Sequence, residues 1–68
     1  MTMKQLAKKY AEYIDSYEFD EEYTAIEHRR NYWIYLKDEY ETHHGSTCIH
    51  DNLDMAEYYL ENVRRKEE

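Results

Sequence analysis

The sequence predicts an all-α fold, a small three-helix bundle, and three observations favour it. The 68 residues include no proline and a single glycine, Gly45, so residues that break helices are nearly absent. Good helix formers such as Leu, Glu, Lys and Arg are plentiful. Apolar residues also recur at intervals of three and four, the spacing that aligns side chains on one face of a helix.

The first helix is expected near residues 3–17. Thr2 stands directly before it and has the hydroxyl that an N-cap residue uses to accept a backbone N–H. The predicted inward face consists of Met3, Leu6, Ala7, Tyr10, Tyr13, Ile14 and Tyr17.

The second helix is expected near residues 21–43. Asp20 would cap it, and Glu21 and Glu22 would lie in its first turn, where the helix dipole favours negative charge. Its inward face would be formed by Tyr23, Ile26, Trp33, Leu36 and Tyr40. At Tyr32-Trp-Ile-Tyr-Leu36 this helix is apolar on all sides, which predicts burial between the other helices or partly against another molecule. Gly45 is expected in the left-handed conformation that ends many helices.

The third helix is expected near residues 47–65, with Ser46, Thr47 or Asp51 as its N-cap. Its apolar repeat is the clearest in the chain: Ile49, Leu53, Ala56, Leu60 and Val63. Short connections favour antiparallel packing of the three helices, so residues 1–68 are predicted to form one helical domain. At this length only roughly 60% of the surface of the unfolded chain is buried on folding. Homodimerisation through the tyrosine-rich side would enlarge such a thin core and is left open.

The charge of the chain favours protein partners over nucleic acid. Nine Lys and Arg residues against sixteen Asp and Glu residues give a net charge of −7. Direct DNA or RNA binding is disfavoured because phosphate contacts need clustered basic residues, whereas a basic protein surface would be attracted. No apolar run suggests a secretory signal or a membrane span, and a lone Cys48 agrees with a reducing compartment. We therefore expect a cytoplasmic protein without a membrane partner.

Charge is arranged in blocks along the chain. Residues 1–11 sum to +3, 12–27 to −7, 28–37 to +3, 38–63 to −7 and 64–68 to +1. In the simplest interpretation these are solvated faces with interhelical ion pairs worth about 0–1 kcal/mol each. In the functional interpretation the carboxylates of a helix form a stripe with a step of roughly 4.5–6 Å, comparable to the phosphate spacing of about 3.4 Å along DNA. The acidic residues assigned to this stripe are Asp15, Glu18, Glu21, Glu22, Asp38, Glu39, Glu41, Asp54, Glu57 and Glu61.

The leading hypothesis is an acidic inhibitor that occludes a basic, nucleic-acid-binding surface of a larger enzyme. In size and charge alone the chain resembles the DNA mimics that phages and mobile elements direct against restriction, CRISPR or replication enzymes. Tyr17, at the end of the first apolar face, and Tyr35 and Tyr58, off the best core faces, are proposed as contact residues, although packing at the rim of the bundle explains them equally well. The alternative is an accessory or regulatory helical module that assembles through apolar and Tyr contacts, with its acids serving solubility.

Metal binding and catalysis have weaker support. Potential ligands cluster within residues 43–51, namely His43, His44, Cys48, His50 and Asp51. Their spacing matches no zinc motif, and the single Glu41-Thr-His-His44 lacks the second such pair that di-iron bundles require. Cys48 and His50 could pair as nucleophile and base, but no third catalytic group is evident. We therefore predict no metal, no cofactor and no enzymatic activity.

Overall fold

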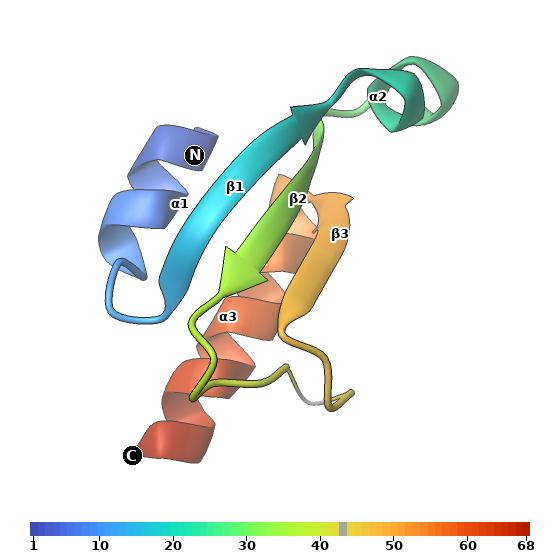
Figure 1. Cartoon of the computed structure of the whole chain (residues 1–68). Coiled ribbons are helices and arrows are strands. Elements are labelled where there is room, and N and C mark those ends of the chain that lie inside the picture. Colours follow the sequence, from blue (N-terminus) through green and yellow to red (C-terminus); the bar gives the residue numbers. More distant parts are fainter. Residues whose placement is uncertain (43) are drawn as a thin grey trace.

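A three-stranded antiparallel sheet with helices against one face forms this domain (Figure 1). The structure is a computed structural model that describes residues 1–42 and 44–68. In chain order its elements are α1 (Met3–Lys9), β1 (Ile14–Asp20), α2 (Glu21–Glu27), β2 (Asn31–Leu36), β3 (Cys48–Asn52) and α3 (Leu53–Glu67). The sheet has the order β1-β2-β3. The prediction of an all-α three-helix bundle, with helices near 3–17, 21–43 and 47–65, is therefore wrong, and the fold is α+β.

The central strand β2 occupies the segment that was predicted to be the most deeply buried part of a helix. Tyr32, Ile34 and Leu36 are buried, whereas Trp33 and Tyr35 between them are more exposed. This alternation has the period of two that belongs to a strand. Both faces of a central strand can carry aromatic and branched side chains, so the segment is apolar throughout and mimics a buried helix in sequence.

Strand β1 replaces the second half of the predicted first helix. Helix α1 already ends at Lys9, and the chain turns before it enters β1. In β1 only Ile14 is buried, and the next five residues are exposed. A β-bulge between Ile14 and Ser16 shifts the register against β2, so Ile14 opposes Leu36 and Ser16 opposes Tyr35. β1 is thus a solvated edge strand and not the inward face of a helix.

Several local predictions are confirmed and one is wrong. Thr2 caps α1, and Asp20 caps α2 by accepting the backbone N–H of Tyr23 at 2.9 Å. The predicted acidic first turn of α2 is present as well. For α3, however, the N-cap is Asn52, which accepts the N–H of Met55, and not one of the three residues proposed. An amide side chain caps as well as a hydroxyl or a carboxylate does, so the sequence left several candidates in this polar segment.

Helix α2 ends at a left-handed residue that is not glycine. His28 has φ of 57°, a region that L-amino acids occupy at a cost and that His tolerates better than branched residues. Gly45 also has positive φ, 79°, but it lies in the connection between β2 and β3 and ends no helix. Because the helix end was predicted at Gly45, the end of α2 at His28 was not predicted, and the predicted helix extended through β2.

Because His28 has a left-handed backbone conformation, the effect of a substitution on stability should depend on how easily the new residue adopts positive φ, and not on lost side-chain contacts. His28→Val is expected to destabilise the protein by about 1–2 kcal/mol, since a branched side chain crowds the backbone at positive φ. His28→Gly should cost far less, because glycine adopts this conformation without a steric penalty. Urea unfolding of the two variants measures the difference, and equal losses would contradict a left-handed end of α2.

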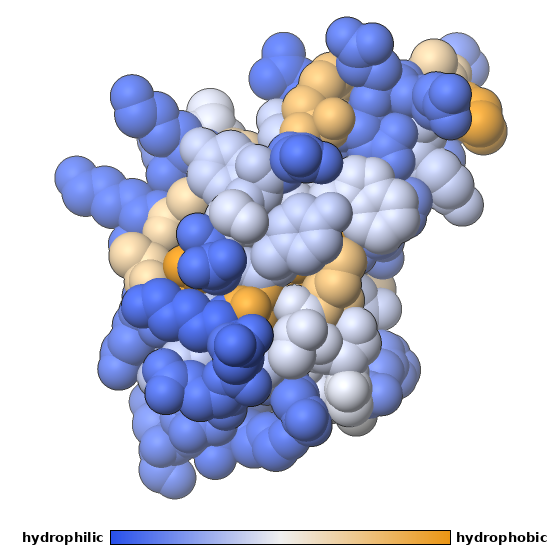
Figure 2. Space-filling model, viewed as in Figure 1, coloured by the Kyte–Doolittle hydropathy of each residue, from blue (hydrophilic) through white to orange (hydrophobic). Residues whose placement is uncertain are grey.

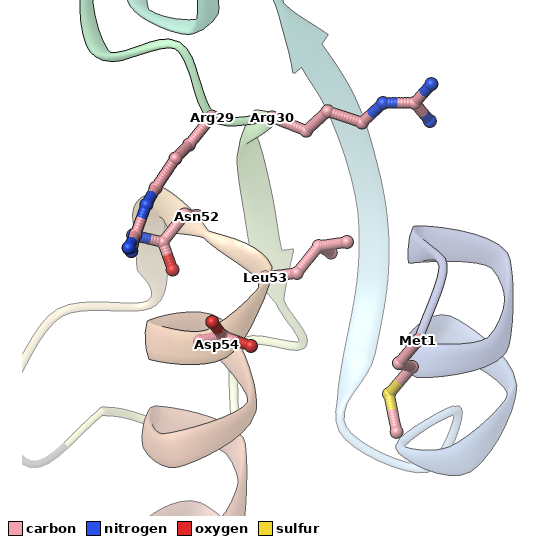
Figure 3. Close-up of a pocket in the computed structure, with 6 residues that line it drawn as sticks. All are labelled: Met1, Arg29, Arg30, Asn52, Leu53 and Asp54. Carbon is pink, nitrogen blue, oxygen red and sulfur yellow. The ribbon is translucent and has the colours of Figure 1, made fainter.

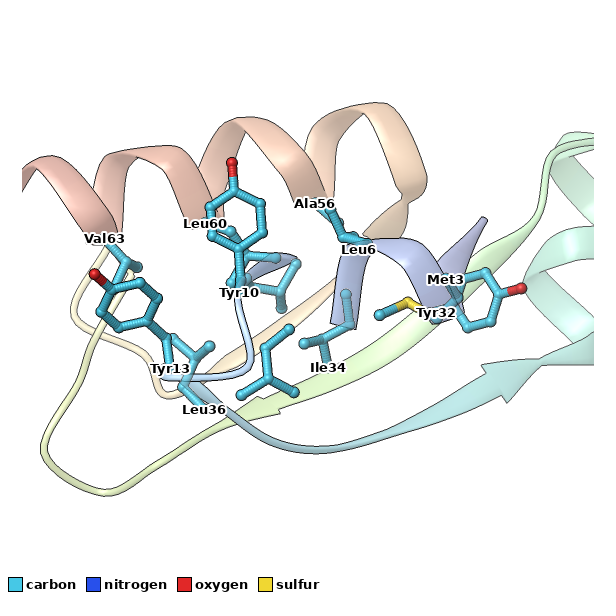
Figure 4. Close-up of a cluster of buried hydrophobic side chains, with 12 residues drawn as sticks. Met3, Leu6, Tyr10, Tyr13, Tyr32, Ile34, Leu36, Ala56, Leu60 and Val63 are labelled. Atoms are coloured by element: carbon cyan, nitrogen blue, oxygen red, sulfur yellow. The ribbon is translucent and has the colours of Figure 1, made fainter. Parts of the chain in front are cut away.

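The core lies between the sheet and the two helices α1 and α3, which pack on the same face (Figure 4). Leu6 of α1, Ile34 of β2 and Leu60 of α3 are all fully buried at its centre. The remaining buried hydrophobic residues are Met3, Tyr10, Tyr13, Ile14, Tyr32, Leu36, Ile49, Ala56 and Val63. Helix α2 stands at one end of the sheet, in the connection between β1 and β2 (Figure 1). None of the described helices is long and apolar enough to cross a membrane.

Candidate interaction site

The carboxylates of α3 lie beside basic side chains in an open groove between α1 and α3. This open groove has a volume of about 490 Å³, and its lining includes Asp54, Glu57 and Glu61. Glu57 Oε2 lies 3.4 Å from Lys9 Nζ, and Glu61 forms an ion pair with Arg64. Two of the three α3 carboxylates in the predicted stripe, Glu57 and Glu61, are thus compensated within the chain itself.

Tyr10 is the buried partner of this acidic groove. Its hydroxyl donates a hydrogen bond to Glu61 Oε2 at 2.8 Å, while its ring is 1% exposed. Burial and then the neighbouring Glu61 carboxylate raise the pKa of Tyr10 to about 12, because both disfavour a phenolate. The hydrogen bonds from Arg64 and Tyr10 lower the pKa of Glu61. The Lys9–Glu57 and Tyr10–Glu61 contacts therefore have a structural role, because they join α1 and the residue after it to α3.

The raised pKa of Tyr10 predicts a loss of stability in alkali. Its ordinary pKa is 10.0 and its folded value is about 12, so the contribution is complete below pH 10 and is lost as the pH rises toward 12. Urea unfolding between pH 8 and pH 11.5 measures this dependence. In Tyr10→Phe the same loss should be smaller, although the variant should be less stable at neutral pH. Parallel curves for the two proteins would contradict the assignment.

A second acidic region surrounds β1 and α2, and no basic residue interrupts it. Residues 12–27 contain no Lys or Arg, and their seven carboxylates are Glu12, Asp15, Glu18, Asp20, Glu21, Glu22 and Glu27. We call residues 12–27 the acidic segment. All seven carboxylate residues except Asp20 are exposed, and within the described part of the chain Asp20 alone among them contacts a side chain that can carry positive charge, His50. The negative charge of this region is therefore presented to solvent.

Asp20 has a structural duty at the end of β1. One carboxylate oxygen accepts the Tyr23 N–H, and the other lies 2.7 Å from His50 Nε2 on β3. The His50 ring stacks on Trp33 of β2, with ring centroids 3.7 Å apart and planes 1° from parallel. The Tyr23 N–H, followed by His50, lowers the pKa of Asp20. The Asp20 carboxylate thus connects β1 to both α2 and β3. The sequence did not predict the contact with His50, because the two residues are 30 positions apart.

The face of the sheet opposite the helices carries aromatic side chains. Trp33 and Tyr35 point to this face, and the cross-strand partners of Trp33 are Glu18 on β1 and His50 on β3. Tyr35 is 37% exposed. Figure 2 shows pale, weakly polar side chains gathered over the sheet and strongly hydrophilic ones around them. This helix-free face is accessible to a partner and adjoins the acidic segment.

The predicted acidic stripe does not lie on a single side of the molecule. Glu18 is on the helix-free face of the sheet, whereas α3, with Asp54, Glu57 and Glu61, covers the other face. Asp38, Glu39 and Glu41 are exposed in the connection after β2. Of the tyrosines proposed as contact residues, Tyr17, Tyr35 and Tyr58 are 41%, 37% and 57% exposed. Asp15, Glu18, Glu21 and Glu22 thus lie along β1 and the first turn of α2, apart from the acids of α3, whereas Tyr17 points to the helix side of the sheet, opposite to Glu18.

The potential metal ligands near Gly45 that the structure describes point in different directions and make separate contacts. Successive residues of β3 face opposite sides of the sheet, so His50 and Asp51 diverge. His50 Nε2 is occupied by Asp20, and Asp51 accepts the backbone N–H of Asn52 at 2.9 Å. Among the described residues no three His, Cys, Asp or Glu side chains converge to hold a metal ion, and His43 lies outside them. Burial raises the pKa of Cys48, which favours the unreactive thiol.

An open depression of about 370 Å³ lies where α3 begins (Figure 3). It is lined by Met1, Arg29, Arg30, Asn52, Leu53 and Asp54. Arg29 extends toward Asn52, whereas Arg30 points in the opposite direction. Because the two guanidinium groups diverge, they do not form a common anion site.

Comparison with protein-family models, curated proteins and solved structures finds no match for this chain.

Proposed function

We propose that this protein is a non-enzymatic inhibitor that binds a basic surface of a larger protein, of the kind that holds nucleic acid. The observation that carries the proposal is the acidic segment, residues 12–27, with seven carboxylates and no Lys or Arg on an exposed strand and helix. Such a field accelerates encounter with a basic partner and makes binding sensitive to salt. Its mechanism is occlusion, which needs no cofactor, and the expected compartment is the cytoplasm.

We infer that the contact surface comprises β1 and the start of α2. Asp15, Glu18, Glu21 and Glu22 are exposed there. Tyr17, Phe19 and Tyr23 alternate with them and are 41%, 49% and 43% exposed. Carboxylates supply the attraction, and aromatic rings supply rigid contact area at a low entropic cost. The acids of α3 contribute less, because Lys9 and Arg64 compensate two of them.

A second candidate function has its own support. The helix-free face of the sheet presents Trp33 and Tyr35, and Tyr58 is 57% exposed on α3. These rings favour an accessory or regulatory module that assembles through apolar and Tyr contacts, with the acidic residues serving solubility. Dimerisation through such a face would belong to this alternative.

Affinity capture from host cells, followed by competition, separates the two functions. The captured partner should release the chain as salt increases, and the chain should displace DNA or RNA from that partner. Charge reversal at Glu18, Glu21 and Glu22 should weaken the complex, whereas Tyr35→Ala and Tyr58→Ala should have little effect. A complex that resists both salt and charge reversal, but is lost in the Tyr variants, would reject the inhibitor in favour of the accessory module.

A further inference from the structure

Strand β1 has an outer edge at which the backbone groups of Tyr17 and Phe19 have no partner among the described residues. The N–H of Lys37 bonds to the carbonyl of Tyr13 at 2.9 Å, and the N–H of Leu36 bonds across to Thr47 on the β3 side. Since bonding residues alternate in an antiparallel ladder, Trp33 turns its backbone groups toward Glu18. Tyr17 and Phe19 then turn their N–H and C=O groups outward, and no described turn, loop or side chain pairs with them.

The other edge of the sheet is blocked at two of its outward-facing residues, Cys48 and Asn52. On β3 the hydroxyl of Ser46 accepts the N–H of Cys48 at 3.1 Å and donates to the carbonyl of the same residue at 3.2 Å. Asp51 accepts the N–H of Asn52. Proteins commonly block free edges in such ways, because an open edge recruits another strand. β1 is therefore the more open of the two edges.

Charge identifies the occupant of this edge. A second copy of the chain is disfavoured, because pairing centred on Glu18 would set two like carboxylates opposite each other and would join two chains of net charge −7. An incoming basic strand would instead lie along the exposed carboxylates Asp15 and Glu18. We propose that the basic partner binds by strand addition to the outer edge of β1, an inference that rests on the proposed function and specifies its contact.

The register of β1 defines the side chains that the incoming strand needs. Opposite Ser16 and Glu18, on the helix-free face, it should carry Lys or Arg. Opposite Tyr17 and Phe19, on the helix side, it should carry apolar or branched residues that pack on those rings. The preferred segment therefore alternates basic and apolar residues, a period of two that a random basic tail lacks.

Synthetic peptides test this contact with the intact chain. The probe is an acetylated and amidated peptide, Lys-Thr-Lys-Val-Lys-Thr-Lys, compared with a peptide N-methylated at the Thr and Val residues and with one of the same composition in which the lysines are grouped. The alternating peptide should bind, and each control should bind about tenfold more weakly or less, since N-methylation removes the edge hydrogen bonds without changing charge. Equal binding of all three peptides would overturn strand addition.

Variants of β1 provide the complementary test. Tyr17→Pro removes an outward N–H and is compatible with an edge strand, whereas Tyr17→Ala also removes the ring but keeps the N–H and serves as the matched control. Tyr17→Pro should bind the probe about tenfold more weakly than Tyr17→Ala does. If Glu18→Lys alone weakens binding, strand addition is rejected and the inhibitor proposal stands. If the captured partner is insensitive to salt as well, both are rejected.

Discussion

Ile34→Ala is expected to destabilise this protein by about 2–5 kcal/mol, enough to unfold much of a domain of this size. Ile34 is 0% exposed at the centre of β2, where it opposes Tyr17 on β1 and Ile49 on β3 and faces the core under α1 and α3. Its removal leaves a cavity between sheet and helices. In a strand the loss is larger than in a helix, because alanine has a poor strand propensity but the best helix propensity.

Chemical unfolding followed by circular dichroism measures this effect. The matched control is Ile26→Ala, which deletes the same atoms from a residue of α2 that is 73% exposed, and its free energy of unfolding should change by less than about 0.5 kcal/mol. Equal losses in the two variants would contradict the burial of β2 that the fold requires.

The double reversal Asp15→Lys, Glu18→Lys is expected to slow association with a basic partner about tenfold or more at low ionic strength. Both residues are exposed on β1 and within the acidic segment. The change raises the net charge from −7 by four units to −3. Dissociation should change less than association, because the main effect of these charges is long-range attraction, and the difference should shrink as salt shortens the screening length.

Glu67→Lys, Glu68→Lys is the control for net charge. It also gives −3 but alters exposed residues at the end of the chain, far from β1 in sequence. Stopped-flow or surface-binding kinetics on the captured partner should place this control near the wild type. If the two double variants slow association equally, the acidic segment has no special part and only total charge matters.

Features that depend on neighbouring residues could be predicted from the sequence. Thr2 and Asp20 cap helices as expected, because a cap needs only its own side chain and the next three residues. Ala56, Leu60 and Val63 also form the buried face of α3, as their spacing predicts. These features join residues only a few positions apart, so the local sequence pattern is enough to predict them.

The strands could not be predicted, because their stability comes from residues that are distant in sequence. The ladder pairs Ile14 with Leu36 and Asn31 with Asn52, contacts that no local pattern encodes. Good helix formers and a lack of glycine and proline then favoured helix by default, and tertiary pairing overrode that propensity. The Asp20–His50 contact was missed for the same reason. The exposure of most carboxylates in the acidic segment, in contrast, follows from their charge, whereas Tyr17, Tyr23 and Ile26 were predicted to face inward and are exposed.

Amide hydrogen exchange along β1, measured by NMR in the free protein and with the alternating peptide, tests the central claim most directly. The claim is that the acidic segment is built on an open edge strand. In the free protein the N–H of Glu18, which faces β2, should exchange slowly, whereas those of Tyr17 and Phe19 should exchange fast. The peptide should slow the exchange of Tyr17 and Phe19. Uniform exchange across these three residues, unchanged by the peptide, would contradict the account.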